Sequence, residues 1–144
     1  MLGLLAALAG IYVFCFSDWF RPRIIHISHV SRALRSRAGK PPRAPAETVP
    51  VSFSFDCPYQ PTEIKVVLLA AWQTNRNVLP VWHLIASSNA APIKTFVYGQ
   101  RIRGLKPAVP GAHAEPLEPN TTYRLFVAAG SATGQHDFET KAAR

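Results

Sequence analysis

LEPNTTYRLFVAAGSATGQHDFET, residues 117–140, carries the clearest structural pattern of the chain. Apolar and polar side chains alternate along residues 122–129 and again along 136–140, which is the pattern of β-strands that bury one face. Between them GSATG, residues 130–134, lacks the lysine and the following helix of a phosphate-binding loop and fits a hairpin turn. The stretch therefore predicts two antiparallel strands joined by a short connection.

The same alternation continues upstream and predicts four more strands, separated by clusters of Pro, Asn and Gly. They are VSFSFD (51–56), EIKVVLLAA (63–71), VWHLIAS (81–87) and IKTFVYG (93–99). Six short strands without a convincing helix predict an all-β fold, an antiparallel β-sandwich over residues 51–141. The alternation assigns these residues to the core: Val66, Leu68, Trp82, Leu84, Phe96, Tyr98, Tyr123, Leu125 or Val127, Phe126 and Phe138. Trp72, beside a polar turn, is expected to make a surface contact.

Leu117, Pro119, Thr121 and Tyr123 follow the spacing Leu-x-Pro-x-Thr-x-Tyr, which leads into an alternating strand. In this respect the chain resembles the fibronectin type III family, whose domains are immunoglobulin-like β-sandwiches. The resemblance implies a tyrosine corner at Tyr123, with the hydroxyl bonded to backbone a few residues upstream and the ring in the core. Leu117 and Pro119 would be structural residues of the same corner.

An apolar run opens the chain, where residues 1–20 read MLGLLAALAGIYVFCFSDWF without a charged side chain from Leu2 to Phe16. About 20 helical residues span the hydrocarbon core of a bilayer. Residues 1–20 are therefore predicted to form a single transmembrane helix. A cleaved signal peptide fits less well, because positive charge follows the run instead of preceding it and the residues near its end are bulky.

Small residues recur along this predicted helix, since Gly3 and Ala7 lie four apart, as do Ala6 and Gly10. Such spacing lets membrane helices approach closely, which predicts docking against the helices of integral membrane protein subunits. Glycine and alanine are common in any membrane span, so ordinary composition explains them equally well.

RPRIIHISHVSRALRSRAGK, residues 21–40, is strongly basic and carries apolar residues at helical spacing. It is predicted to be an amphipathic helix on the membrane surface, followed by a Pro-rich linker over residues 41–50. The cations expected to contact anionic lipid headgroups or an acidic partner are Arg21, Arg23, Arg32, Arg35, Arg37, Lys40 and Arg43. A solvated basic linker is the alternative. Nucleic-acid binding is not expected, because no aromatic residues are interleaved with the basic ones.

The distribution of charge predicts the orientation of the chain. No Lys or Arg precedes the apolar run and seven follow it up to Arg43, whereas from Glu47 onward nine bases oppose seven acids. The positive-inside rule therefore predicts an inner-membrane protein with its N-terminus outside and its C-terminal domain in the cytoplasm.

No catalytic residues, metal ligands or cofactor site are predicted. His26 and His29 lie three apart, but without a third ligand they are read as polar residues at the membrane interface. The one basic cluster of the domain consists of Arg101, Arg103 and Lys106. It could contact lipid headgroups or an acidic partner, or it could simply be solvated.

These patterns together favour a non-catalytic accessory subunit that helps assemble a larger membrane complex, for which a bacterial respiratory or photosynthetic assembly is a natural host. The alternative is a membrane-tethered recognition module whose sandwich loops bind a peptide, a glycan or a soluble protein. An enzyme is the least favoured class, because the acidic residues are scattered and no nucleophile is spaced from a base.

Overall fold

The computed structural model describes residues 3, 6–7, 10–12, 23–31, 48–87 and 90–142. Its strands are β1 (Ile27–Ser31), β2 (Val51–Tyr59), β3 (Glu63–Leu68), β4 (Trp82–Ala86), β5 (Ile93–Val97), β6 (Leu105–Pro107), β7 (Thr122–Ala129) and β8 (Ala132–Glu139). A short helix, α2 (Leu69–Thr74), follows β3. Each of the six strands predicted from alternation is present.

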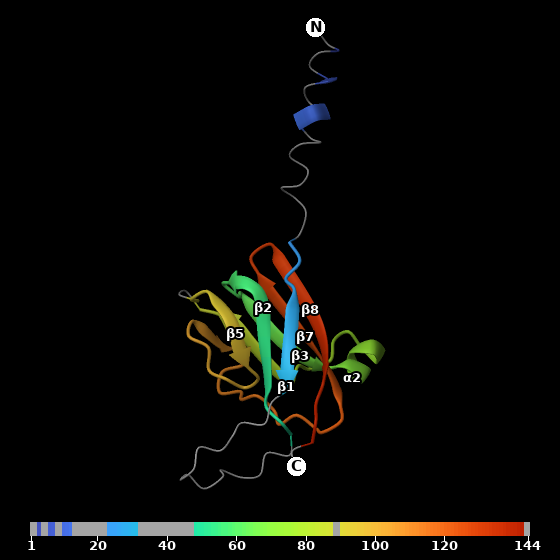
Figure 1. Cartoon of the computed structure of the whole chain (residues 1–144), viewed down its shortest axis with the longest axis vertical. Helices are drawn as coiled ribbons and strands as arrows, with labels where there is room; N and C mark the ends of the chain where they lie inside the picture. The colour runs from blue at the N-terminus through green and yellow to red at the C-terminus, as the bar shows by residue number, and fades with distance from the viewer. Residues whose placement is uncertain are drawn as a thin grey trace.

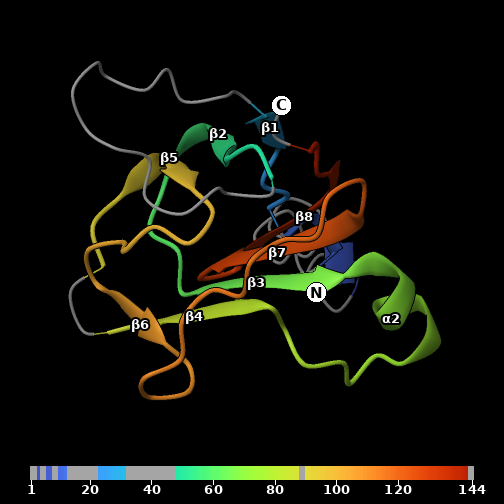
Figure 2. The ribbon, with the colours of Figure 1, turned by 90° about the horizontal axis from the view of Figure 1, so that it is seen from below.

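The strands form two sheets, which Figures 1 and 2 show from two directions. The smaller sheet has the order β1-β2-β5, and the larger has the order β6-β4-β3-β7-β8. Each neighbouring pair in these sheets is antiparallel. The fold is therefore all-β and β-sandwich-like, which confirms the predicted class.

Aromatic side chains from both sheets fill the core. The ring of Phe53 on β2 meets Phe138 on β8 edge to face at 4.9 Å and lies 5.3 Å from Phe96 on β5. Eight of the predicted core residues are buried: Val66, Trp82, Leu84, Phe96, Tyr123, Leu125, Val127 and Phe138. Leu68 and Tyr98 are half-buried and pack against this cluster.

Phe126 corrects the predicted core. Its neighbours Leu125 and Val127 point inward, so the alternation of β7 turns Phe126 to the outer face of the larger sheet. There its ring lies 5.0 Å from Trp72 of α2, with the Lys65 ammonium 5.4 Å from its centroid. Trp72 is half-buried in this contact.

The basic segment is also corrected, because residues 27–31 form strand β1 and not part of an amphipathic helix. β1 pairs with β2, and just before it the Ile25 N–H donates to the Thr133 carbonyl of β8 at 2.8 Å. Ile25 is only 2 % exposed. The physical reason is that Ile25 and Ile27 gain burial between the two sheet edges, which a helix on a lipid surface would not provide. The sandwich-like domain therefore begins at residue 23, well before the predicted boundary at 51.

Two shorter stretches differ from prediction as well. The predicted strand 63–71 stops at Leu68, where Leu69–Thr74 turns into α2, and the long connection after β5 contains the short strand β6. At the end of the predicted linker, Thr48 bridges Ala142 and the Val49 N–H donates to Lys141. Residues 41–47 of that linker lie outside the described residues.

Much of the predicted membrane segment also lies outside the described residues. Within it, Gly3, Ala6, Ala7 and Gly10 are helical and exposed. Among the residues that the structure describes, no helix combines the length and the apolar character needed to cross a membrane. Of the predicted cationic contacts near the N-terminus, Arg23 is described; the others, Arg21, Arg32, Arg35, Arg37, Lys40 and Arg43, are not.

Candidate functional site

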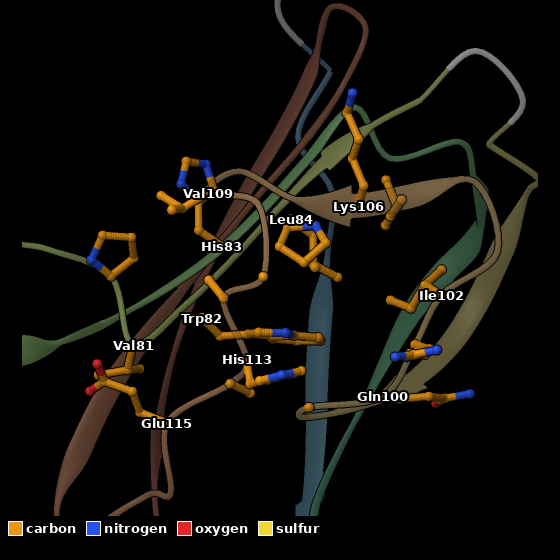
Figure 3. Close-up of a pocket in the computed structure, with 18 of the residues that line it drawn as sticks. Val81, Trp82, His83, Leu84, Gln100, Ile102, Lys106, Val109, His113 and Glu115 are labelled. Atoms are coloured by element: carbon orange, nitrogen blue, oxygen red, sulfur yellow. The ribbon is translucent and has the colours of Figure 1, made fainter.

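A groove of about 880 Å³ lies on the flank of the molecule, where β4 and β6 meet the connections 98–104 and 108–115. Figure 3 shows side chains from these elements gathered around it. Its volume falls within the range of about 300–1,000 Å³ typical of ligand sites.

The floor of the groove is apolar. β4 contributes Trp82 and Leu84, two positions apart and therefore on the same inner face of the strand. The connection before β6 adds Ile102, which is 8 % exposed. Leu79 and Val109 form an exposed apolar lip, at 86 % and 66 % exposure. Because both exposed side chains line the same groove as the apolar floor, the lip is a candidate contact surface.

Cations flank this apolar surface. Arg101, Arg103 and Lys106 all line the groove and are all exposed. Within the described ranges none of the three forms an ion pair. The structure thus brings the predicted basic cluster of the domain to one side of an apolar groove.

Tyr98 holds the groove in shape. Its hydroxyl donates to the Glu115 carbonyl at 2.7 Å and lies 3.3 Å from the Val81 carbonyl, while the Glu115 N–H donates to that same carbonyl at 2.9 Å. Burial, followed by charge interactions with Tyr123 and Glu115, raises the pKa of Tyr98 above its ordinary value. The hydroxyl therefore remains a donor that ties the 108–115 connection to β4.

His83 and Glu63 form the nearest pair of titratable groups to the groove. The Nε2 atom of His83 lies 2.7 Å from the Glu63 Oε1 atom, across the pairing of β3 with β4. A Ser or Cys nucleophile is not among the residues that line the groove. In the described ranges no three His, Cys, Asp or Glu side chains gather as a metal site would require. The groove is thus equipped to bind through apolar and ionic contacts.

The predicted tyrosine corner lies beside the core, apart from the groove. The Tyr123 hydroxyl accepts a hydrogen bond from the Glu118 N–H at 3.0 Å, while Leu117 is buried. Pro119 is half-buried, and its carbonyl accepts from the Thr121 hydroxyl at 3.0 Å. This geometry is what the resemblance implies for Tyr123.

Sequence reasoning missed Leu79 and Val109 as site residues and placed Trp82 only in the core. Two signals could have found the lip. Leu79 stands next to Pro80 outside any alternating run, and Val109 lies between Pro107 and Pro110 in a connection with Gly111. An apolar residue next to proline and outside an alternating run is not assigned to a buried sheet face by its pattern, so it is a candidate for exposure.

The chain was compared with protein-family models, with curated proteins and with solved structures, and nothing in any of the three matches it.

A second cluster joins the two sheets at the opposite edge. The Nδ1 atom of His29 on β1 lies 2.7 Å from the Nε2 atom of His136 on β8. Burial and the neighbouring His29 lower the pKa of His136, which Asp137 opposes. Asp137 itself binds the Arg124 guanidinium through both carboxylate oxygens, at 2.6 and 2.7 Å. His26 and His29 were predicted to be polar residues at the membrane interface. His26 precedes β1, whereas His29 lies in β1 and takes part in the seam with β8.

Acidification is expected to weaken this seam. Because the pKa of His136 in the folded chain lies below the ordinary value of about 6.5, the folded state resists protonation there. The contribution of His136 to stability is full above about pH 6.5 and is lost as the pH falls through its lowered pKa. Urea denaturation midpoints between about pH 8 and about pH 5 measure this. His29→Gln should flatten the profile, whereas His113→Gln, at an exposed histidine, should not; equal profiles for all three proteins would contradict the assignment.

Proposed function

We propose that this chain is a non-catalytic, membrane-anchored recognition protein whose domain binds a partner protein in the groove between β4, β6 and residues 98–115. The observation that carries the proposal is the combination of an apolar floor, an exposed apolar lip and unpaired cations on one surface. Apolar burial supplies most of the affinity of such a site, and charges supply its specificity. The apolar residues 1–20 would hold the chain in the membrane.

The occupant proposed for the groove is an extended acidic segment of the partner. Leu79 and Val109 would cover its apolar side chains, and Arg101 and Lys106 would face its carboxylates. The groove is bordered by the edge strand β6, which is only three residues long. Extended segments are suited to such sheet borders, where side chains alternate toward and away from the protein.

We also propose a fibronectin type III-like arrangement for the domain. The sheet orders β1-β2-β5 and β4-β3-β7-β8 support it, and so does the bond from the Glu118 N–H to the Tyr123 hydroxyl. β6 would then be an addition at the edge of the larger sheet. Domains of this architecture commonly act through surface loops and edges, which agrees with a binding role.

A second candidate is the accessory subunit of a larger membrane complex. The helical residues Gly3 and Gly10 support it, because a Cβ added at either would meet no atom within 4 Å. That surface is free to receive a partner helix. In both candidates the domain would lie on the cytoplasmic side of an inner membrane, since Arg21 and Arg23 follow the apolar run and no base precedes it.

Peptide selection tests the groove. A displayed library of random peptides, selected on the full-length chain in detergent, is expected to yield sequences that mix acidic and apolar residues. The double variant Arg101→Glu/Lys106→Glu should bind the selected peptides about tenfold more weakly, because each ion pair contributes up to about 1 kcal/mol and reversal adds repulsion.

The matched control is Lys94→Glu/Lys141→Glu, which makes the same change in net charge at exposed positions outside the groove. This control should bind as the wild-type chain does. If both double variants lost affinity equally, binding would reflect overall charge and the groove assignment would fail.

A further inference from the structure

One row of backbone hydrogen bonds crosses the larger sheet near the end where residues 23–25 join it. The Thr133 N–H donates to the Arg23 carbonyl at 2.9 Å, and Thr133 pairs with Ala128 across β7 and β8. The Thr62 N–H donates to the Ala128 carbonyl at 2.7 Å, and the Ala86 N–H donates to the Thr62 carbonyl at 2.8 Å. These residues therefore lie at one level of the molecule.

The connections beyond that level carry no charge. Their described residues are 60–62 (QPT), 87 and 90–92 (S and AAP) and 130–131 (GS). Figure 1 shows the turns that follow β2 and β7 at the end of the sheets where β1 begins. Between the connections lies a hollow of about 810 Å³, whose lining of Pro, Tyr, Gln, Thr, Ala, Ser and Gly includes no charged residue. We call this surface the loop end.

Residues 23–25, just before β1, are packed against the larger sheet at the loop end. Ile25 is 2 % exposed, and a Cβ on Gly134 would lie 2.6 Å from the Ile25 carbonyl oxygen, so the two backbones are in close contact. From Phe20, the end of the apolar run, to Arg23 the chain has three residue steps, which reach at most about 11 Å. The headgroup layer of a bilayer is itself about 5–8 Å thick.

We propose that the loop end rests on the surface of the lipid bilayer. The proposal depends on the membrane anchoring of residues 1–20 given above. With Phe20 at the interface, Arg23 cannot lie more than a few ångströms beyond the headgroups, and the described connection residues 60–62, 87, 90–92 and 130–131 lie at or beyond the level of Arg23. The loop end is therefore turned toward the membrane.

The chemistry of the loop end fits a lipid surface. Its uncharged centre needs no counterions, and Tyr59, which lines the hollow, is a residue type that favours the interface. Cations stand on two sides: Arg23 beside β8, and Arg103 next to Gly104, whose carbonyl accepts from the Ser87 N–H at 2.8 Å. Both guanidinium groups would meet headgroup phosphates.

Two of the predicted cations flank the loop end. They are Arg23 and Arg103, both among the described residues. The five predicted cations that follow β1 in the sequence lie outside the described residues.

Depth measurements on the full-length chain test the proposal. In a Cys15→Ala/Cys57→Ser background, single cysteines at the loop-end positions Gln60 and Ser131 carry an environment-sensitive fluorophore, and Gln73 on α2 and Lys141 serve as matched exposed controls. The chain is reconstituted in vesicles of phosphatidylcholine and phosphatidylglycerol that include lipids with a nitroxide on the headgroup. We expect strong quenching at Gln60 and Ser131, and none above background at Gln73 and Lys141.

Flotation of the same vesicles separates the possible failures. If the chain floats with the vesicles but all four positions escape quenching, or if Gln73 and Lys141 are quenched as strongly as Gln60 and Ser131, the loop end does not face lipid and the inference is wrong while the anchor stands. If the chain does not float with the vesicles, the membrane anchor itself fails, and the inference fails with it.

Discussion

Gly134→Ala is expected to detach the first strand from the domain and lower the free energy of unfolding by about 2–4 kcal/mol. A Cβ at this position would lie 2.6 Å from the backbone carbonyl oxygen of Ile25 and 2.9 Å from the side-chain Cβ atom of the same buried residue. The segment before β1 would have to move away from β8. Ile25 would lose burial worth about 1.5–3 kcal/mol, together with the hydrogen bonds on either side of Thr133.

Thermal unfolding of the full-length chain in detergent measures this effect. For a domain of this size, each kcal/mol shifts the Tm by about 4–8 °C, so a fall of about 10 °C or more is expected. Hydrogen exchange locates the effect, because the amides of Ile25 and Thr133 should lose protection before those of β3.

Gly130→Ala is the matched control for Gly134→Ala. Gly130 has φ +63°, but a Cβ there would meet no atom within 4 Å. Its cost should be limited to the left-handed backbone strain of about 1–2 kcal/mol, with no loss of protection at Ile25. Normal protection of Ile25 in Gly134→Ala would contradict the close packing of the N-terminal segment on β8.

Thr140→Val is the second substitution with a large expected effect. Thr140 is completely buried, and its hydroxyl donates to the Glu118 carbonyl and accepts from the Thr121 N–H at 3.1 Å. Valine has nearly the same shape but no hydroxyl, so both backbone groups would lose their partner. Each unpaired buried group costs about 1–3 kcal/mol, which predicts a loss of about 2–4 kcal/mol in urea denaturation.

Two further variants separate the effect of losing the hydroxyl from the effect of changing the side chain at this position. Thr140→Ser keeps the hydroxyl and should cost no more than about 1.5 kcal/mol, through the lost methyl group. Thr95→Val, at an exposed position of β5, should change stability by less than about 0.5 kcal/mol. A loss in Thr140→Ser equal to that in Thr140→Val would show that packing, and not hydrogen bonding, holds this corner.

The interior strands could be predicted from sequence because one of their faces is buried. Val51, Phe53 and Phe55 alternate with polar residues, and the structure buries all three. β1 could not be recognised in this way. Val30 is more than half exposed, while His29 turns toward the seam. The apolar residues of β1 therefore do not mark its buried face, and alternation alone could not reveal this strand.

The candidate groove could be predicted only in part. Arg101, Arg103 and Lys106 stand close in the sequence, so their clustering was visible without a structure. The apolar surface beside them combines Leu79, Trp82 and Val109, which come from separate connections and strand β4. Only the pairing of β4 with β6 and the bonds of Tyr98 to Val81 and Glu115 bring these residues together.

The loop end and the groove could bind their two proposed partners at the same time. The loop end would face the bilayer, and the groove on the flank of the domain would remain open to a partner at the membrane. The lip residue Val109 lies in the connection between β6 and β7, away from the three connections of the loop end. A partner segment could contact Val109, Arg101 and Lys106 in the groove, while Arg103 would lie where the groove borders the lipid surface.

Photo-crosslinking in native membranes tests whether the groove binds a partner protein. A benzophenone amino acid replaces Val109 on the lip of the groove in one variant and Lys94, an exposed residue of β5, in the control. We expect a defined crosslinked protein at Val109, mapped by mass spectrometry to an acidic extended segment and lost in Arg101→Glu/Lys106→Glu. Crosslinks that are absent at Val109, or that form equally at Lys94, would contradict a binding role for the groove.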